Sequence, residues 1–124
     1  MAQEPASTGR DAASGQQTEW DRQSIYLRLQ EGSPTVFWIR GEEAVPLQSR
    51  PDLFDHEGGF GWGRESDDCM ALAVAIVARL VEMGLVDPAQ QDAKGRYLHH
   101  EVLAKLPADE PRDLHLSYLR LLLG

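Results

Sequence analysis

The fold is decided by residues 24–39, which read SIYLRLQEGSPTVFWI. At the start of this stretch apolar and polar side chains alternate, which is typical of a strand with one buried face. Residues 31–34 have the composition of a turn, and the β-branched and aromatic residues 35–39 predict a returning strand. A third strand is expected over residues 44–48, at a sheet edge because Pro46 has no N–H to donate. The first half of the chain therefore predicts an antiparallel β-meander.

A central helix is expected after Ser66. Ser66 is a typical N-cap, and Asp67 and Asp68 place negative charge where the helix dipole favours it. Gly84 is typical of the position just past a helix C-terminus. Almost every residue from 69 to 83 is apolar, so this helix must be covered on most of its sides.

Two more helices are expected after the central one. The pair Asp87–Pro88 is a helix start signal, and the next helix is expected over about residues 89–106. A final leucine-rich helix is expected over Leu114–Leu123, with Asp113 or Ser117 as its cap. Strands followed by helices indicate an α+β fold, in which an N-terminal antiparallel meander of three to four strands packs on two to three C-terminal helices.

The chain has 124 residues, which fits one domain at roughly 100–200 residues per domain. Residues 1–22 contain almost no aliphatic side chains, so they are predicted to form a disordered N-terminal tail before a single domain over residues 23–124. No apolar run approaches the roughly 18 residues of a membrane span, and no signal-peptide pattern occurs. We therefore expect a cytoplasmic protein with no membrane contact.

The negative charge is concentrated in one part of the chain. The formal net charge is −8, and residues 41–68 carry eight acidic and two basic side chains. Overall acidity argues against direct nucleic-acid binding, because phosphates would be repelled. One interpretation of the segment is a solvated loop whose acids aid solubility and cap a helix. The other is an acidic docking surface for a basic partner, which at the extreme imitates the phosphate array of DNA.

Under the second interpretation, eight residues are candidates for partner binding. They are Glu42, Glu43, Asp55, Glu57, Glu65, Asp67, Asp68 and Trp38. Trp38 is included because, if Phe37 faces the core, Trp38 faces outward beside Tyr26 or Arg28 and can anchor an interface.

One segment nearly matches a phosphate-binding loop. Residues 58–65 carry the glycines, but Arg64 replaces the lysine and Glu65 stands where a magnesium-binding hydroxyl is needed. The acids at the start of the following helix also disfavour an anionic phosphate. Nucleotide binding is therefore not predicted.

Metal-ligating residue types occur at 55–57, 67–68 and 99–101, without a diagnostic spacing. The lone Cys69 excludes an internal disulfide framework and a multi-Cys zinc site, and we expect it to be a buried core residue. We predict no catalytic residue, no cofactor and no metal. A metal-dependent hydrolase or nuclease is kept as an alternative.

A short motif carries a family resemblance. Residues 60–63 read FGWG and are expected to form a short strand, and the small apolar residues 71–76 follow in the central helix. This combination resembles a family of small uncharacterised domains of bacteriophages, plasmids and integrative elements, in which residues 97–106 would be the second helix. The chain departs from the family pattern at residues 64–68. The resemblance implies an origin in a mobile element and a bacterial host cell, and it implies no catalytic residues.

The leading hypothesis combines this origin with the acidic segment. It is a non-enzymatic protein-binding module that docks on a basic protein or nucleoprotein complex of the host, in its concrete form an inhibitor of a defence complex of the anti-CRISPR type. A further alternative is an accessory or oligomerising protein. In that case the chain would form a homo-oligomer through Leu114–Leu123.

Overall fold

The computed structural model describes residues 22–56, 58–108 and 110–123. The expected tail over residues 1–22 lies outside these ranges apart from Arg22. The described part of the chain forms a four-stranded antiparallel sheet and three α-helices, so the predicted α+β fold is confirmed.

The sheet consists of β1 (Gln23–Gln30), β2 (Ser33–Arg40), β3 (Glu43–Pro46) and β4 (Arg112–His115), in the order β3-β2-β1-β4. Each neighbouring pair is antiparallel, which confirms the predicted meander. Pro46 lies in the edge strand β3, where its missing N–H costs no ladder hydrogen bond.

A two-residue turn joins β1 to β2. Glu31 and Gly32 both have positive φ, at 53° and 83°, and this is the backbone of a type I′ hairpin turn. The expected turn over residues 31–34 is therefore too long, because Ser33 and Pro34 already belong to β2. The short turn fixes the pairing of the two strands.

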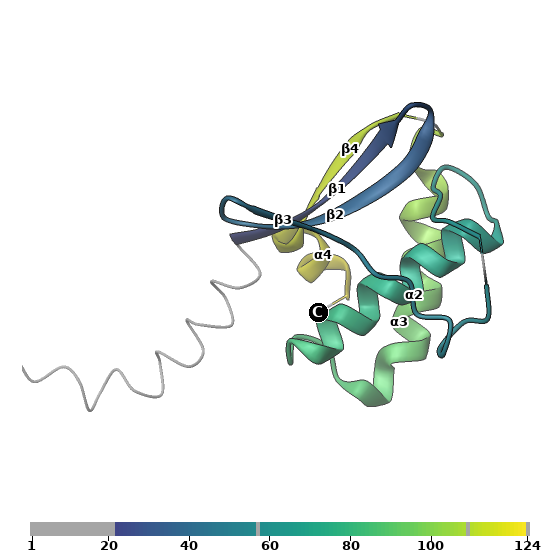
Figure 1. Cartoon of the computed structure of the whole chain (residues 1–124). Coiled ribbons are helices and arrows are strands. Elements are labelled where there is room, and N and C mark those ends of the chain that lie inside the picture. Colours follow the sequence, from purple (N-terminus) through teal and green to yellow (C-terminus); the bar gives the residue numbers. More distant parts are fainter. Residues whose placement is uncertain (1–21, 57, 109, 124) are drawn as a thin grey trace, which may run out of the picture.

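The helices are α2 (Asp67–Glu82), α3 (Gln91–Glu101) and α4 (Leu116–Leu123), and they lie on one face of the sheet (Figure 1). Short 3₁₀ turns, η1 (Pro88–Gln90) and η2 (Leu103–Lys105), flank α3. The helix expected over residues 89–106 is thus a shorter α-helix between two tighter turns.

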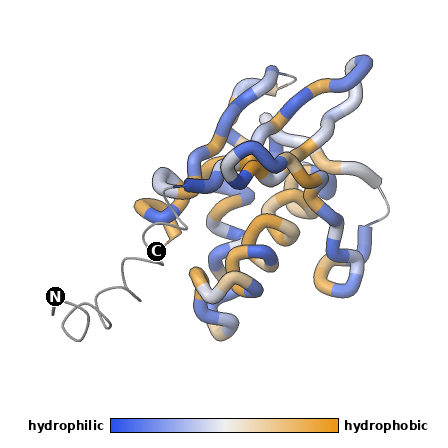
Figure 2. The backbone as a smooth tube through the Cα atoms, turned by 60° about the vertical axis from the view of Figure 1, so that its left-hand side comes forward, coloured by the Kyte–Doolittle hydropathy of each residue, from blue (hydrophilic) through white to orange (hydrophobic). Residues whose placement is uncertain are grey.

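The ends of α2 follow the sequence signals. Ser66 is the N-cap, and its Oγ accepts a hydrogen bond of 3.2 Å from the Cys69 N–H. Gly84 follows the helix with a φ of 76°. Leu72, Ile76 and other apolar side chains of α2 are fully buried in the core. In Figure 2, hydrophobic residues gather mainly where the helices and strands face one another.

The final helix begins later than expected, at Leu116, because residues 112–115 form β4. Asp113 therefore lies in a strand, and Ser117 lies inside the helix, so neither is the expected cap. Leu114 of β4 pairs with Ile25 of β1, and both side chains are buried. Pairing with β1 outweighs the local helical preference of these residues.

Residues 60–63 do not form the expected strand. The Trp62 Nε1–H donates to the Glu110 carbonyl at 3.0 Å, and the Gly63 N–H donates to the Leu103 carbonyl at 2.8 Å. This loop is therefore fastened to the loops around η2 rather than to another strand. Gly63 also has a φ of 93°, which a β-strand does not use.

Candidate protein-binding surface

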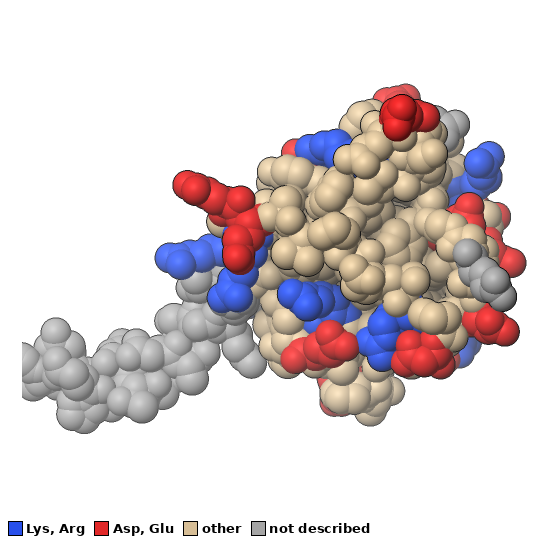
Figure 3. Space-filling model, in the orientation of Figure 1, with Lys and Arg blue, Asp and Glu red and all other residues tan. Residues whose placement is uncertain are grey.

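The predicted acidic residues lie in two separate places. Glu42 and Glu43 are at the turn between β2 and β3. Asp55, Glu65, Asp67 and Asp68 belong to the segment before α2 and to its first turn, and Glu57 lies outside the described residues. Figure 1 places the β2–β3 turn and the start of α2 at opposite ends of the fold, and Figure 3 shows acidic side chains at both ends. The acidic residues that the structure describes therefore do not form the expected single surface.

Two of the acids near α2 have local partners. The Asp68 Oδ1 lies 2.6 Å from the His56 Nε2, and the Glu65 Oε1 lies 2.6 Å from the His100 Nδ1. Asp67 lies in the first turn of α2, where its charge complements the helix dipole. These contacts give the acids structural roles that require no partner.

Trp38 faces the core, so the prediction that it faces outward is wrong. Only 3% of its surface is exposed, and its Nε1–H donates to the Gln23 Oε1 at 2.6 Å. The strand register pairs Trp38 with Ile25 and Phe37 with Tyr26. Because directly opposed side chains point to the same face, Phe37 takes the outward position that was expected for Trp38.

The face of the sheet away from the helices carries an apolar patch, which we call the outer sheet face. Its centre is formed by Tyr26, Phe37 and Ile39, which are partly exposed and lie outside the hydrophobic core. Pro46 of β3 pairs with Phe37 and extends the row to the sheet edge. None of the described helices covers this face (Figure 1).

Polar side chains border the outer sheet face along β1 and β4. The Arg28 guanidinium lies 4.3 Å from the centre of the Tyr26 ring, and its Nη2 is 2.7 Å from the Asp113 Oδ1. The Ser24 Oγ is 2.9 Å from the His115 Nδ1. An aromatic centre with a polar rim is the usual composition of a protein interface.

The sequence contains a signal for this surface, but the alternation of apolar and polar residues does not reveal it. Val36, Phe37, Trp38 and Ile39 are all apolar, so alternation within β2 does not show which of them face the core. A two-residue turn at residues 31–32 determines the register, because it places Phe37 opposite Tyr26.

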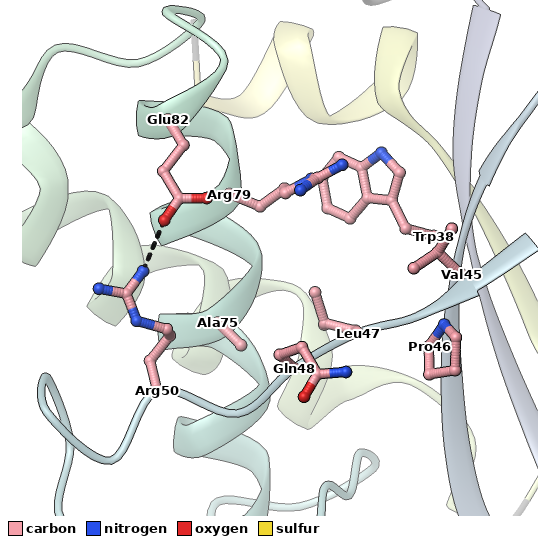
Figure 4. A pocket seen from close by; sticks show the side chains of 9 residues that line it. All are labelled: Trp38, Val45, Pro46, Leu47, Gln48, Arg50, Ala75, Arg79 and Glu82. Atoms are coloured by element: carbon pink, nitrogen blue, oxygen red, sulfur yellow. Dashed lines mark hydrogen bonds and ion pairs between the residues drawn. The ribbon is translucent and has the colours of Figure 1, made fainter.

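A groove lies on the helix side of the sheet, between α2 and the segment that contains β3 (Figure 4). Its volume is about 300 Å³. Val45 and Leu47 supply apolar walls, and Val45 is 51% exposed. The guanidinium of Arg79 lies over the Trp38 ring, 5.5 Å from its centre. The sequence gives no local signal for this groove, because its lining comes from β2, β3 and α2, which are distant along the chain.

Arg50, the second arginine of the groove, is paired with two carboxylates. Arg50 forms hydrogen bonds of 3.0 and 2.8 Å to the two Asp52 carboxylate oxygens and one of 2.9 Å to Glu82. The hydrogen bond from Arg50 lowers the pKa of Asp52 below its usual value. This pairing fastens the loop after β3 to α2.

Two observations concern metal-ligating side chains and the thiol within the described ranges. No three His, Cys, Asp or Glu side chains there lie close enough to hold a metal ion together. Cys69 is buried, as predicted, and burial followed by the charge of Glu65 raises the pKa of its thiol to about 12. A thiol with this pKa stays protonated and is a poor nucleophile.

We therefore expect Cys69 to be unreactive in the folded protein. At about pH 8, its reaction with a disulfide reagent should be at least about 100-fold slower than in the unfolded chain, because burial suppresses both the thiolate and its access. Absorbance of the released thiol, with and without denaturant, measures both rates. Rapid labelling without denaturant would show that the thiol is accessible.

His99 is the second buried group with unusual surroundings. It is 7% exposed, and neither ring nitrogen has a hydrogen-bond partner among the described residues. Its pKa is lowered, chiefly by burial and then by the neighbouring His100, against a smaller opposite effect of Glu65. Protonation of His99 is therefore disfavoured in the folded state.

This shift predicts how stability depends on pH. Below the ordinary histidine pKa of about 6.5, the unfolded chain binds a proton that folded His99 resists. The free energy of unfolding should therefore fall as the pH drops below about 6.5, and this loss should stop below the lowered pKa of folded His99. Urea unfolding at several pH values measures the effect. His99→Phe should remove this part of the pH dependence, and His115→Gln, at an exposed histidine that does not act on His99, should retain it. An unchanged slope in His99→Phe would assign the effect to other groups.

The leucine-rich C-terminal segment packs mostly within its own chain. Leu114, Leu116, Leu119 and Leu123 are buried, whereas Leu121 is 83% exposed. The predicted stripe for another chain is thus largely part of the core.

None of the described helices has the length and apolar character needed to cross a membrane. Comparison with protein-family models, curated proteins and solved structures finds no match for this chain. The resemblance to mobile-element domains stays a prediction.

Proposed function

We propose that this protein is a non-enzymatic binding module whose protein partner packs on the outer sheet face. The supporting observation is the row formed by Tyr26, Phe37 and Pro46, with Ile39 beside it, on a face that no described helix covers. Apolar patches on a small protein commonly mark interaction sites, and aromatic side chains supply much of the energy at such sites. Phe37 lies at the centre of this patch.

Replacing Phe37 with aspartate is expected to weaken partner binding by about 100-fold or more, because it places a charge in the apolar centre of the interface. Tagged wild-type and variant proteins can be compared for the partner that they retain from a bacterial lysate. Leu121→Asp is the matched control, since Leu121 is exposed on α4, away from this face. Thermal denaturation verifies that both variants are folded. Equal retention of the partner by Phe37→Asp would contradict the proposal.

The acidic residues lead to a narrower proposal, that the partner is a basic protein or nucleoprotein complex such as the target of an anti-CRISPR inhibitor. The excess of negative charge supports it, and separate variants at the two acidic ends can test it. Glu42→Gln with Glu43→Gln removes charge at one end, and Asp67→Asn removes charge at the other. Charge-steered binding weakens with rising salt and with these substitutions. Binding that is insensitive to both would leave the apolar face as the only determinant.

A further inference from the structure

We propose that the groove between α2 and β3 binds an extended peptide segment of a partner protein, and that a carboxylate of this segment pairs with Arg79. This site lies on the helix side of the sheet, so it is separate from the outer sheet face. Either site can be tested without the other.

The charge of the groove indicates an anionic ligand group. Arg79 is exposed and forms no ion pair with any described residue, whereas Arg50 is already paired with Asp52 and Glu82. The indole of Trp38 holds the Arg79 guanidinium by a cation–π contact and leaves its N–H groups available. A guanidinium placed in this way binds a carboxylate with two parallel hydrogen bonds.

The edge strand indicates that the ligand is extended. The Leu47 N–H donates to the Val36 carbonyl at 2.9 Å, so odd-numbered residues of this segment direct their backbone groups toward β2. Because these directions alternate in an antiparallel pair, the N–H and C=O of Ala44 and the C=O of Pro46 point away from β2. A short peptide can pair with these groups as an added strand.

The side chains beside the β3 edge also indicate a peptide strand at this position. Val45 points to the helix side of the sheet, as its pairing partner Trp38 does, and half of its surface is exposed. A peptide strand beside β3 would cover Val45, and its alternate side chains would enter the groove toward Arg79. The volume of about 300 Å³ is at the lower end of ligand pockets, which suits one acidic side chain.

Paired peptide arrays test the ligand class directly. Short peptides with randomised residues carry either a glutamate or a glutamine at one fixed position, and the full-length protein is applied to both sets. We expect the glutamate peptides to bind about 10-fold more tightly as a group, because only they form charge-assisted hydrogen bonds with Arg79. Equal binding of the two sets, or no binding of either set, would overturn the proposal.

Two variants and one control assign the effect to the groove. Arg79→Gln should abolish the preference for glutamate, and Arg96→Gln on α3 should retain it. Ala44→Pro removes an N–H that points away from β2, so it should weaken peptide binding while the melting temperature of the fold stays nearly the same.

A preference for glutamate that persists in Arg79→Gln would place the site elsewhere. Binding of free acetate as tightly as the best peptide, or unchanged peptide binding by Ala44→Pro, would overturn the extended peptide as the ligand. Retention of the Phe37-dependent partner by Arg79→Gln distinguishes this site from the outer sheet face.

Discussion

Replacement of Gly63 by alanine is expected to lower the free energy of unfolding by about 3 kcal/mol or more. An added Cβ would lie 2.4 Å from the Ala108 Cα and 2.6 Å from its Cβ, and the φ of Gly63 is 93°. The substitution therefore combines a backbone conformation that alanine resists with a clash against main-chain atoms that cannot rotate away. Urea unfolding of the wild type and the variant at one pH measures the loss.

Gly84→Ala is the matched control for this prediction. Gly84 also has a positive φ, of 76°, but an added Cβ would meet no atom within 4 Å. We expect the control to lose only about 1 kcal/mol, which is the usual cost of a left-handed backbone. Equal losses in the two variants would show that the contact between residues 60–63 and the loop around Ala108 is not rigid. Since this contact fastens the start of α2 to the C-terminal half, its strength bears on the whole fold.

Replacement of Trp38 by alanine is expected to lower the free energy of unfolding by about 3–5 kcal/mol. The substitution removes a large buried ring from the core and the hydrogen bond from its Nε1–H to Gln23. Truncation of a fully exposed side chain would instead change stability by less than about 0.5 kcal/mol. Chemical denaturation thus tests the orientation of β2 without knowledge of any partner.

Two further substitutions separate the contributions at this position. Trp38→Phe keeps most of the apolar volume and should lose about 1–2 kcal/mol, largely through the missing hydrogen bond. Phe37→Ala, on the opposite face, should lose about 1 kcal/mol because its ring lies outside the core. If Phe37→Ala were the more destabilising of the two alanine variants, the assigned faces of β2 would have to be exchanged.

The orientation of β2 also changes the interpretation of function. The sequence predicted an aromatic interface residue on this strand and assigned it to Trp38, whereas the register assigns the outward position to Phe37. Trp38 instead supports Arg79 from inside the groove. The acidic residues show a comparable difference, because closeness in the sequence did not place them on one surface.

Local signals in the sequence determined much of this fold. Alternation predicted β1, Pro46 marked an edge strand, and Ser66 and Gly84 marked the ends of α2. Each of these features depends on neighbouring residues, through side-chain periodicity, a missing N–H, or the hydrogen bonds at a helix end. These features can therefore be predicted without knowledge of the rest of the chain.

Local signals did not reveal that Leu114 pairs with Ile25 or that residues 60–63 form a loop, and these features depend on the tertiary structure. The same holds for the groove, where Arg79 of α2 meets Trp38 of β2. These features arise between segments that are distant along the chain. Their energies come from hydrogen bonds and packing that form only when these distant segments meet in the folded chain.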